Sequence, residues 1–140
     1  MKKLKLLVTK IKGVIIVFGI ICIVLAYYFG PQVLNLIYGI KLNLYRTNLC
    51  LIIFAYVLYS LSYLDLVILT TFRKSIVQIV IYLFGIIIAF LGGNILVSKF
   101  EINGATFSCV TTLGFLFLAY EWATLKNYRN IERQEFEIKL

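Results

Sequence analysis

Histidine is missing from this 140-residue sequence, and other residues that build catalytic or metal sites are scarce. The three cysteines, Cys22, Cys50 and Cys109, are scattered through apolar stretches, and no two of them form a Cys-x-x-Cys pair. Zinc, haem and thiol-redox sites therefore lack their usual ligands. No motif pairs a base with a nucleophile, and phosphate-binding glycine motifs are missing as well. We expect no enzymatic activity, no catalytic residues, no metal and no cofactor. A disulfide between Cys50 and Cys109 is an alternative to the interpretation we favour, three small apolar side chains.

Acidic residues are also few, with 6 Asp and Glu against 14 Lys and Arg and a formal net charge of +8. In a soluble protein this excess would favour nucleic-acid binding. Here the basic residues stand at the ends of apolar runs, where they act as topology signals and contact anionic lipids. We therefore expect membrane lipids as partners and no direct binding of nucleic acid.

Hydrophobic residues are abundant, at 62% of the chain, and the mean hydropathy is +0.98. The apolar share of a soluble domain is nearer one half, whereas a transmembrane helix needs about 20 consecutive apolar residues. The sequence predicts an all-α integral membrane protein with one transmembrane domain, residues 1–125, and a charged cytoplasmic tail, residues 126–140. Its four predicted transmembrane helices cover residues 8–29, 49–71, 75–97 and 105–125.

The segment between the first two predicted spans is the least regular part of the chain. Gly30-Pro31 is expected to end the first helix, because the residue before a proline avoids helical geometry. Residues 32–48 then place their apolar side chains on one helical face, which predicts a short helix in the membrane interface. Residues 40–44 also alternate as a strand would, and this alternative stays open.

Lysine and arginine are distributed unevenly about the spans. Eleven lie on the side that carries both termini, and three lie on the other side. The positive-inside rule places the side with more basic residues in the cytoplasm. We therefore expect a multi-pass protein of the bacterial cytoplasmic (inner) membrane, with both termini in the cytoplasm.

Asp65 and Glu121 are the only acids within the predicted spans. A charge in hydrocarbon costs a few kcal/mol, so an intramembrane acid is a functional candidate by default. Glu121 stands beside Trp122 near a helix end, which favours an interfacial position for it. Asp65 lies six residues, or about 9 Å of helix, from the end of its span, within reach of water or a nearby lysine.

Two interpretations of Asp65 stay open. In the functional one, Asp65 belongs to a proton or cation site together with Tyr63 and Gln78. In the structural one, which we favour, Arg73, Lys74 or Gln78 holds the Asp65 carboxylate and thereby fixes the register of the second and third helices.

Small residues recur every four positions on the third predicted helix, at Gly85, Ala89 and Gly93. In lipid, ridges of small residues let helix backbones approach closely. This ridge is a candidate packing face, either within the chain or between the subunits of a homo-oligomer.

Charged residues gather on the predicted cytoplasmic side, in the turn after the second helix and in the tail. This pattern favours a non-catalytic, homo-oligomeric membrane sensor or anchor that docks a cytosolic protein partner. The membrane component of a phage-defence or toxin-immunity pair is an example of such a protein. The alternative is an oligomeric ion channel or small-solute transporter with Asp65 near its inner mouth. The candidate partner-docking residues are Arg73, Lys74, Lys126, Arg129, Glu132, Arg133, Glu135 and Glu137.

Overall fold

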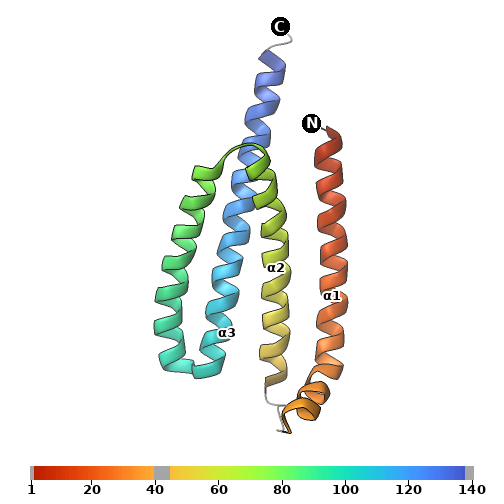
Figure 1. Cartoon of the computed structure of the whole chain (residues 1–140), viewed down its shortest axis with the longest axis vertical. Helices are drawn as coiled ribbons and strands as arrows, with labels where there is room; N and C mark the ends of the chain where they lie inside the picture. Colours follow the sequence, from red (N-terminus) through yellow and green to blue (C-terminus); the bar gives the residue numbers. More distant parts are fainter. Residues whose placement is uncertain (1, 40–44, 138–140) are drawn as a thin grey trace.

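The computed structural model describes residues 2–39 and 45–137, and these residues form three α-helices and no strand. The helices are α1 (Lys2–Tyr38), α2 (Arg46–Thr71) and α3 (Ser75–Glu137). Each contains a stretch long and apolar enough to cross a membrane. The beginning of α1 and the end of α3 lie at the same end of the bundle (Figure 1). The all-helical, membrane-type architecture expected from composition is confirmed at this level.

The first helix differs from its prediction, because α1 does not end at Gly30-Pro31 but continues through Pro31 to Tyr38. A proline removes one intrahelical hydrogen bond and bends a helix without necessarily ending it. Figure 1 shows this bend, with the last turns of α1 set at an angle to the rest. Residues 32–38 of the expected interfacial helix therefore belong to α1, whereas residues 40–44 lie outside the described residues.

A tight turn joins α2 to α3. The Arg73 N–H donates to the Thr70 carbonyl at 2.9 Å, and the Lys74 N–H donates to the Leu69 carbonyl at 3.0 Å. This pair of bonds is the Schellman arrangement that satisfies the last carbonyls of a helix. Arg73 has φ 55°, in the left-handed region that favours glycine. The turn therefore fixes the point at which α3 begins, directly after Lys74, at a cost in backbone strain on Arg73.

Helix α3 reverses direction at Glu101, whose backbone is not helical (φ 49°, ψ −122°). Its two arms then lie side by side (Figure 1). Gly104 permits the reversal, since a Cβ there would overlap the backbone of Leu96 and Val97. The observed turn is shorter than the gap between the predicted spans 75–97 and 105–125, because helical geometry resumes directly after Glu101. The second arm then extends to Glu137.

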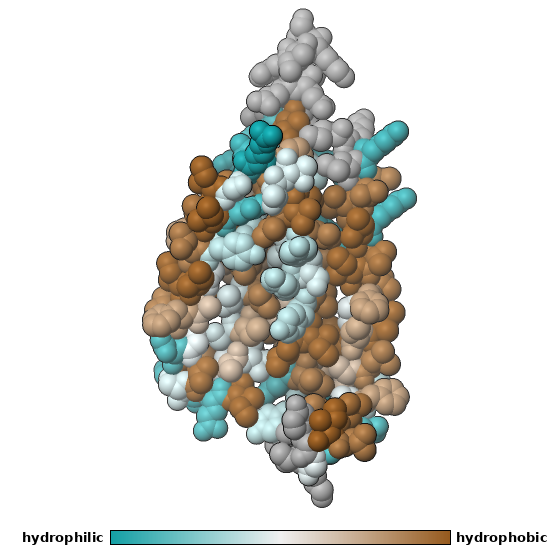
Figure 2. Space-filling model, viewed as in Figure 1, coloured by the Kyte–Doolittle hydropathy of each residue, from teal (hydrophilic) through white to brown (hydrophobic). Residues whose placement is uncertain are grey.

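The apolar core lies between α2 and the two arms of α3, and α1 packs mainly along α2. The buried cluster consists of Leu69, Ile81, Leu116, Tyr120 and Ala123. Large apolar side chains cover most of the remaining surface, including nearly the whole length of α1. Figure 2 shows these apolar residues along the helices and hydrophilic residues gathered toward the two ends, a distribution that suits a bilayer.

Candidate functional site

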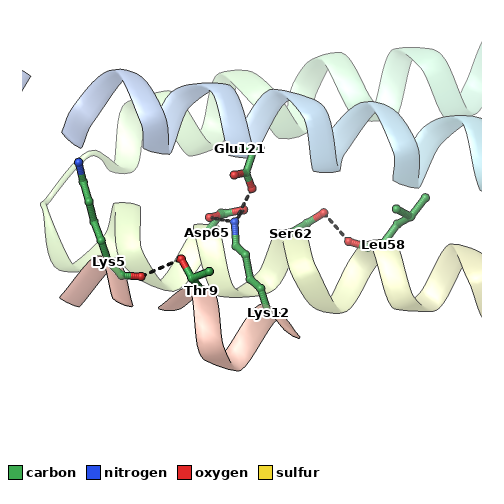
Figure 3. A network of polar contacts seen from close by, with 7 residues as sticks. All are labelled: Lys5, Thr9, Lys12, Leu58, Ser62, Asp65 and Glu121. Atoms are coloured by element: carbon green, nitrogen blue, oxygen red, sulfur yellow. Dashed lines mark hydrogen bonds and ion pairs between the residues drawn. The ribbon is translucent and has the colours of Figure 1, made fainter. Parts of the chain in front are cut away.

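Three charged side chains, one from each helix, meet inside the bundle. The Lys12 ammonium of α1 lies 3.0 Å from both carboxylate oxygens of Asp65 on α2, and it donates a hydrogen bond to Oδ2. The same ammonium also pairs with the Glu121 carboxylate on the second arm of α3. Figure 3 shows the Lys12 side chain reaching between the two acids. This Lys12–Asp65–Glu121 cluster ties together helices that are up to 109 residues apart in sequence.

Burial within the cluster is uneven. The Asp65 side chain is fully buried, the Lys12 side chain is 18% exposed and the Glu121 side chain is 34% exposed. A buried charge is tolerated when it is paired and hydrogen-bonded. With all three groups ionised, one ammonium faces two carboxylates, so the cluster carries a net charge of −1.

A polar cavity of about 310 Å³ adjoins the cluster and is lined in part by Lys12, Asp65 and Glu121. Thr124 and Tyr128, from the next turns of α3, also line it and are 3% and 6% exposed. The Thr124 and Tyr128 hydroxyls and the Asp65 Oδ1 atom accept or donate no hydrogen bond among the described residues. A water molecule needs two to four polar partners, and this cavity offers them. The cavity can therefore hold water against the carboxylates.

The other charged group at this cavity is Lys5, on the first turns of α1. Its ammonium lies over the Tyr128 ring, 5.1 Å from the ring centroid. Figure 3 shows this ammonium pointing away from the carboxylates of Asp65 and Glu121. Lys5 therefore contributes to the wall of the cavity beside the Tyr128 ring.

The structure gives Asp65 a different partner from those expected. Arg73 and Lys74 lie in the exposed turn, and the Gln78 amide donates to the Leu66 carbonyl at 2.9 Å and to Thr70 Oγ1 at 2.8 Å. Gln78 does fix the register of α2 against α3, but it does so without the carboxylate. Tyr63 is exposed on the far side of α2, where it lines an apolar groove against α1. The expectation that Arg73, Lys74 or Gln78 holds the Asp65 carboxylate is therefore wrong, because Lys12 holds it. The grouping of Asp65 with Tyr63 and Gln78 in a proton or cation site stays a prediction.

Glu121 faces the Lys12 ammonium between α1 and the second arm of α3, and its side chain is 34% exposed. Its predicted position at the membrane interface stays a prediction. Its neighbour Trp122 is 61% exposed and turns the other way, with the Lys126 ammonium 5.0 Å from its ring centroid. The helix thus separates a charged inner face from an aromatic outer face.

The candidate docking residues lie at the end of the bundle where α1 begins. Arg73, Lys74, Lys126 and Arg129 are exposed there. The side chains of Glu132, Arg133, Glu135 and Glu137 lie outside the described part of the chain, although the backbone of α3 is helical as far as Glu137.

The small-residue ridge is divided between two environments. Gly85 is buried against Leu116, where a Cβ would approach the leucine side chain to 2.9 Å, so it serves packing between the two arms of α3. Ala89 is exposed, and a Cβ at Gly93 would meet no atom within 4 Å. That part of the ridge faces away from the bundle. The three cysteines are free thiols.

Comparison with protein-family models, with curated proteins and with solved structures finds no match to this chain. The chemistry of the site is therefore argued from its own residues. The residue that sequence reasoning missed is Lys12, which was grouped with the other lysines at the start of the chain. Lys12 can be recognised by its depth in the membrane. It is the last charged residue before the uncharged run 13–40, and it lies within the first predicted span.

Proposed function

We propose that this chain is a four-span protein of the bacterial cytoplasmic membrane, with both termini in the cytoplasm, and that it is a proton-responsive membrane sensor. The two arms of α3 supply the third and fourth crossings, and the positive-inside rule supplies the orientation. The observation that carries the sensor function is the Lys12–Asp65–Glu121 cluster.

The net charge of the Lys12–Asp65–Glu121 cluster favours the binding of a proton. One ammonium neutralises one carboxylate, and the second carboxylate leaves a net charge of −1 at a site that is largely buried. An uncompensated charge in a low-dielectric interior is unfavourable, and binding one proton removes it. Because the two acids share one lysine, that proton belongs to the pair and not to either residue alone.

The cavity beside the cluster gives protons access to the carboxylates. The polar cavity reaches the cluster from the side of Lys5 and Tyr128, near the end of the bundle where α1 begins. Protons therefore have a route between the carboxylates and the proposed cytoplasmic side. A group that binds a proton only when that side is acidic responds to cytoplasmic pH.

The described part of the bundle beyond the cluster lacks the ionisable side chains that would continue a proton route across the membrane, which favours sensing over transport. Between the cluster and the opposite end of the bundle, the described parts of the three helices carry no acidic or basic side chain until Arg46, Lys99 and Glu101. Proton transporters use chains of ionisable residues across the membrane. Here the ionisable side chains of the described residues reach from one end of the bundle only as far as the cluster, which is sufficient for a sensor.

The output of the sensor is the end of α3. Glu121 lies on the same helical arm as Lys126 and Arg129. When the proton neutralises one acid, the ion pair that joins α1 to this arm weakens, and the arm and the charged segment that follows are freer to move. A cytosolic protein that docks on this segment would detect the change.

A distance measurement between the two helices tests the proposal. Spin labels at Lys3→Cys on α1 and Arg129→Cys on α3, with the three native cysteines replaced by alanine, report the separation of these exposed positions in lipid bilayers. We expect the distance distribution to broaden toward longer values when the pH is lowered from neutral to acidic. Glu121→Gln imitates the protonated pair and should show the acidic distribution at both pH values.

Glu101→Gln is the matched control, because it removes an exposed acid at the opposite end of the bundle and should behave as the parent does. A distribution that is the same at both pH values in the parent would contradict the sensor. Proton flux into liposomes that Asp65→Asn removes would also contradict it, in favour of the channel alternative.

A further inference from the structure

A second pocket lies at the same end of the bundle, on the opposite face of α3 from the cluster. Its volume is about 180 Å³, and its wall includes Lys74, Trp122, Lys126, Asn127 and Asn130. It shares no lining residue with the cavity beside the cluster. The feature is therefore independent of the proton-binding site.

The charged side chains of this pocket are both hydrogen-bond donors. Lys74 and Lys126 supply two positive charges, and no acid is among the described residues that line it. The nearest acid in sequence, Glu121, directs its carboxylate to Lys12. In addition, the Asn127 Nδ2 atom is buried and donates no hydrogen bond to any described residue. An unpaired buried donor in the same pocket as two lysines is complementary to an oxyanion.

The remaining wall is apolar and faces the bilayer. Leu69 and Ala123 form a buried floor, and Val77 and Trp122 are exposed at the rim. Tryptophan is enriched where helices leave the hydrocarbon, at the level of lipid headgroups. The Lys126 ammonium, stacked on the Trp122 ring, is held at that level. A ligand that fills this pocket therefore has an anionic head and an acyl tail.

The turn between α2 and α3 fixes the backbone of Lys74, the second lysine in the wall of the pocket. The Lys74 N–H is bonded to the Leu69 carbonyl, and its own carbonyl accepts the Val77 N–H at 3.1 Å. The backbone of Lys74 is thus fixed on both sides, although its side chain is exposed. The lysine is held opposite Lys126 by the fold and not by chance proximity of two flexible segments.

We propose that this pocket binds the phosphate group of an anionic phospholipid. Basic pockets between helices on the cytoplasmic side of a membrane bind the headgroups of such lipids. Zwitterionic lipids are discriminated against, because the lining offers no carboxylate to receive their ammonium group. The site holds a lipid at the turn that precedes α3 and at the outer face of the arm that carries Glu121.

The chain provides its own probe, since Trp122 is its only tryptophan and lies in the wall of the pocket. Brominated acyl chains quench tryptophan fluorescence on contact. The full-length protein is reconstituted in mixed vesicles in which either phosphatidylglycerol or phosphatidylcholine carries the bromine as a minor component. We expect stronger quenching by the brominated anionic lipid, and the ratio of the two quenching constants measures the preference.

The variant Lys74→Gln/Lys126→Gln should lower this preference by about fivefold for each lysine removed. The control Lys3→Gln/Lys10→Gln changes the net charge equally at exposed positions at the same end of the bundle and should leave the preference intact. Because the ratio is measured within each variant, loss of the stacking between Lys126 and Trp122 cancels from it.

Three results would overturn the proposal. One is equal quenching by the two lipids in the parent protein. Another is a loss of preference in the control variant as large as in the pocket variant, which would make the effect one of general surface charge. The third is displacement of the brominated anionic lipid by an excess of inorganic phosphate, which would identify a soluble phosphate compound as the ligand.

Discussion

Removing the cation from the cluster is the most informative single change. Lys12→Met preserves the length and apolar stem of the side chain and deletes only the ammonium that lies 3.0 Å from both oxygens of Asp65. The fully buried Asp65 carboxylate and the partly exposed Glu121 carboxylate then face each other without a counterion. We expect the free energy of unfolding to fall.

The size of this loss follows from burial. Breaking a buried ion pair by removing one partner costs about 3–5 kcal/mol. We expect the lower end, about 3 kcal/mol, because Glu121 is one-third exposed and is partly screened by water. The loss should shrink as the pH is lowered, since protonation removes the charge that lacks a partner. Asp65→Asn added to Lys12→Met should recover part of the stability for the same reason.

Reversible unfolding in mixed detergent micelles measures these differences. Lys10→Met is the control, because Lys10 is exposed one half-turn away on the same helix and its loss should change stability by no more than about 0.5 kcal/mol. If Lys12→Met and Lys10→Met have equal effects at neutral pH, the cluster does not hold the helices together and the reasoning is refuted.

Three further predictions use the same unfolding assay. Asp65→Asn should cost about 1–2 kcal/mol more than Glu121→Gln, because Asp65 is fully buried; equal costs would place the two acids in similar surroundings. Gly104→Ala should cost at least about 2 kcal/mol, since its Cβ would overlap the facing arm of α3, whereas Gly93→Ala meets nothing and should be near neutral. Arg73→Gly should raise stability by about 1 kcal/mol by relieving the positive φ of that residue, and a loss of stability would show that the arginine side chain outweighs the strain.

The helical membrane architecture was predictable because it depends on composition and run length, which are local properties of the sequence. The details that failed depend on tertiary context. Pro31 was expected to end a helix, but it is buried and the helix bends and continues. The predicted spans 75–97 and 105–125 left residues 98–104 for the connecting turn, but the close approach allowed by Gly104 lets the chain reverse with a single non-helical residue, Glu101.

The candidate site was predictable in part. Asp65 and Glu121 can be recognised from the sequence alone as acids within apolar spans, and both belong to the cluster. Their shared partner was missed because Lys12 also fits a topology signal at the start of a span. Periodicity shows which residues share a helical face, but not which helices face each other across the 53 residues that separate Lys12 from Asp65. Matching the depths of buried acids with the depths of lysines inside the spans would have identified the pair.

The most direct test of the cluster is a distance measurement in lipid bilayers by solid-state NMR. Asp65 is the only aspartate in the sequence, so ¹³C labelling of aspartate side-chain carboxyls marks a single site, and ¹⁵N labelling of lysine Nζ marks its partner. Strong dipolar dephasing of the Asp65 carboxyl carbon by a lysine nitrogen is expected in the parent protein and in Lys10→Met, and its loss is expected in Lys12→Met. No dephasing in the parent, or dephasing that survives Lys12→Met, would contradict the account.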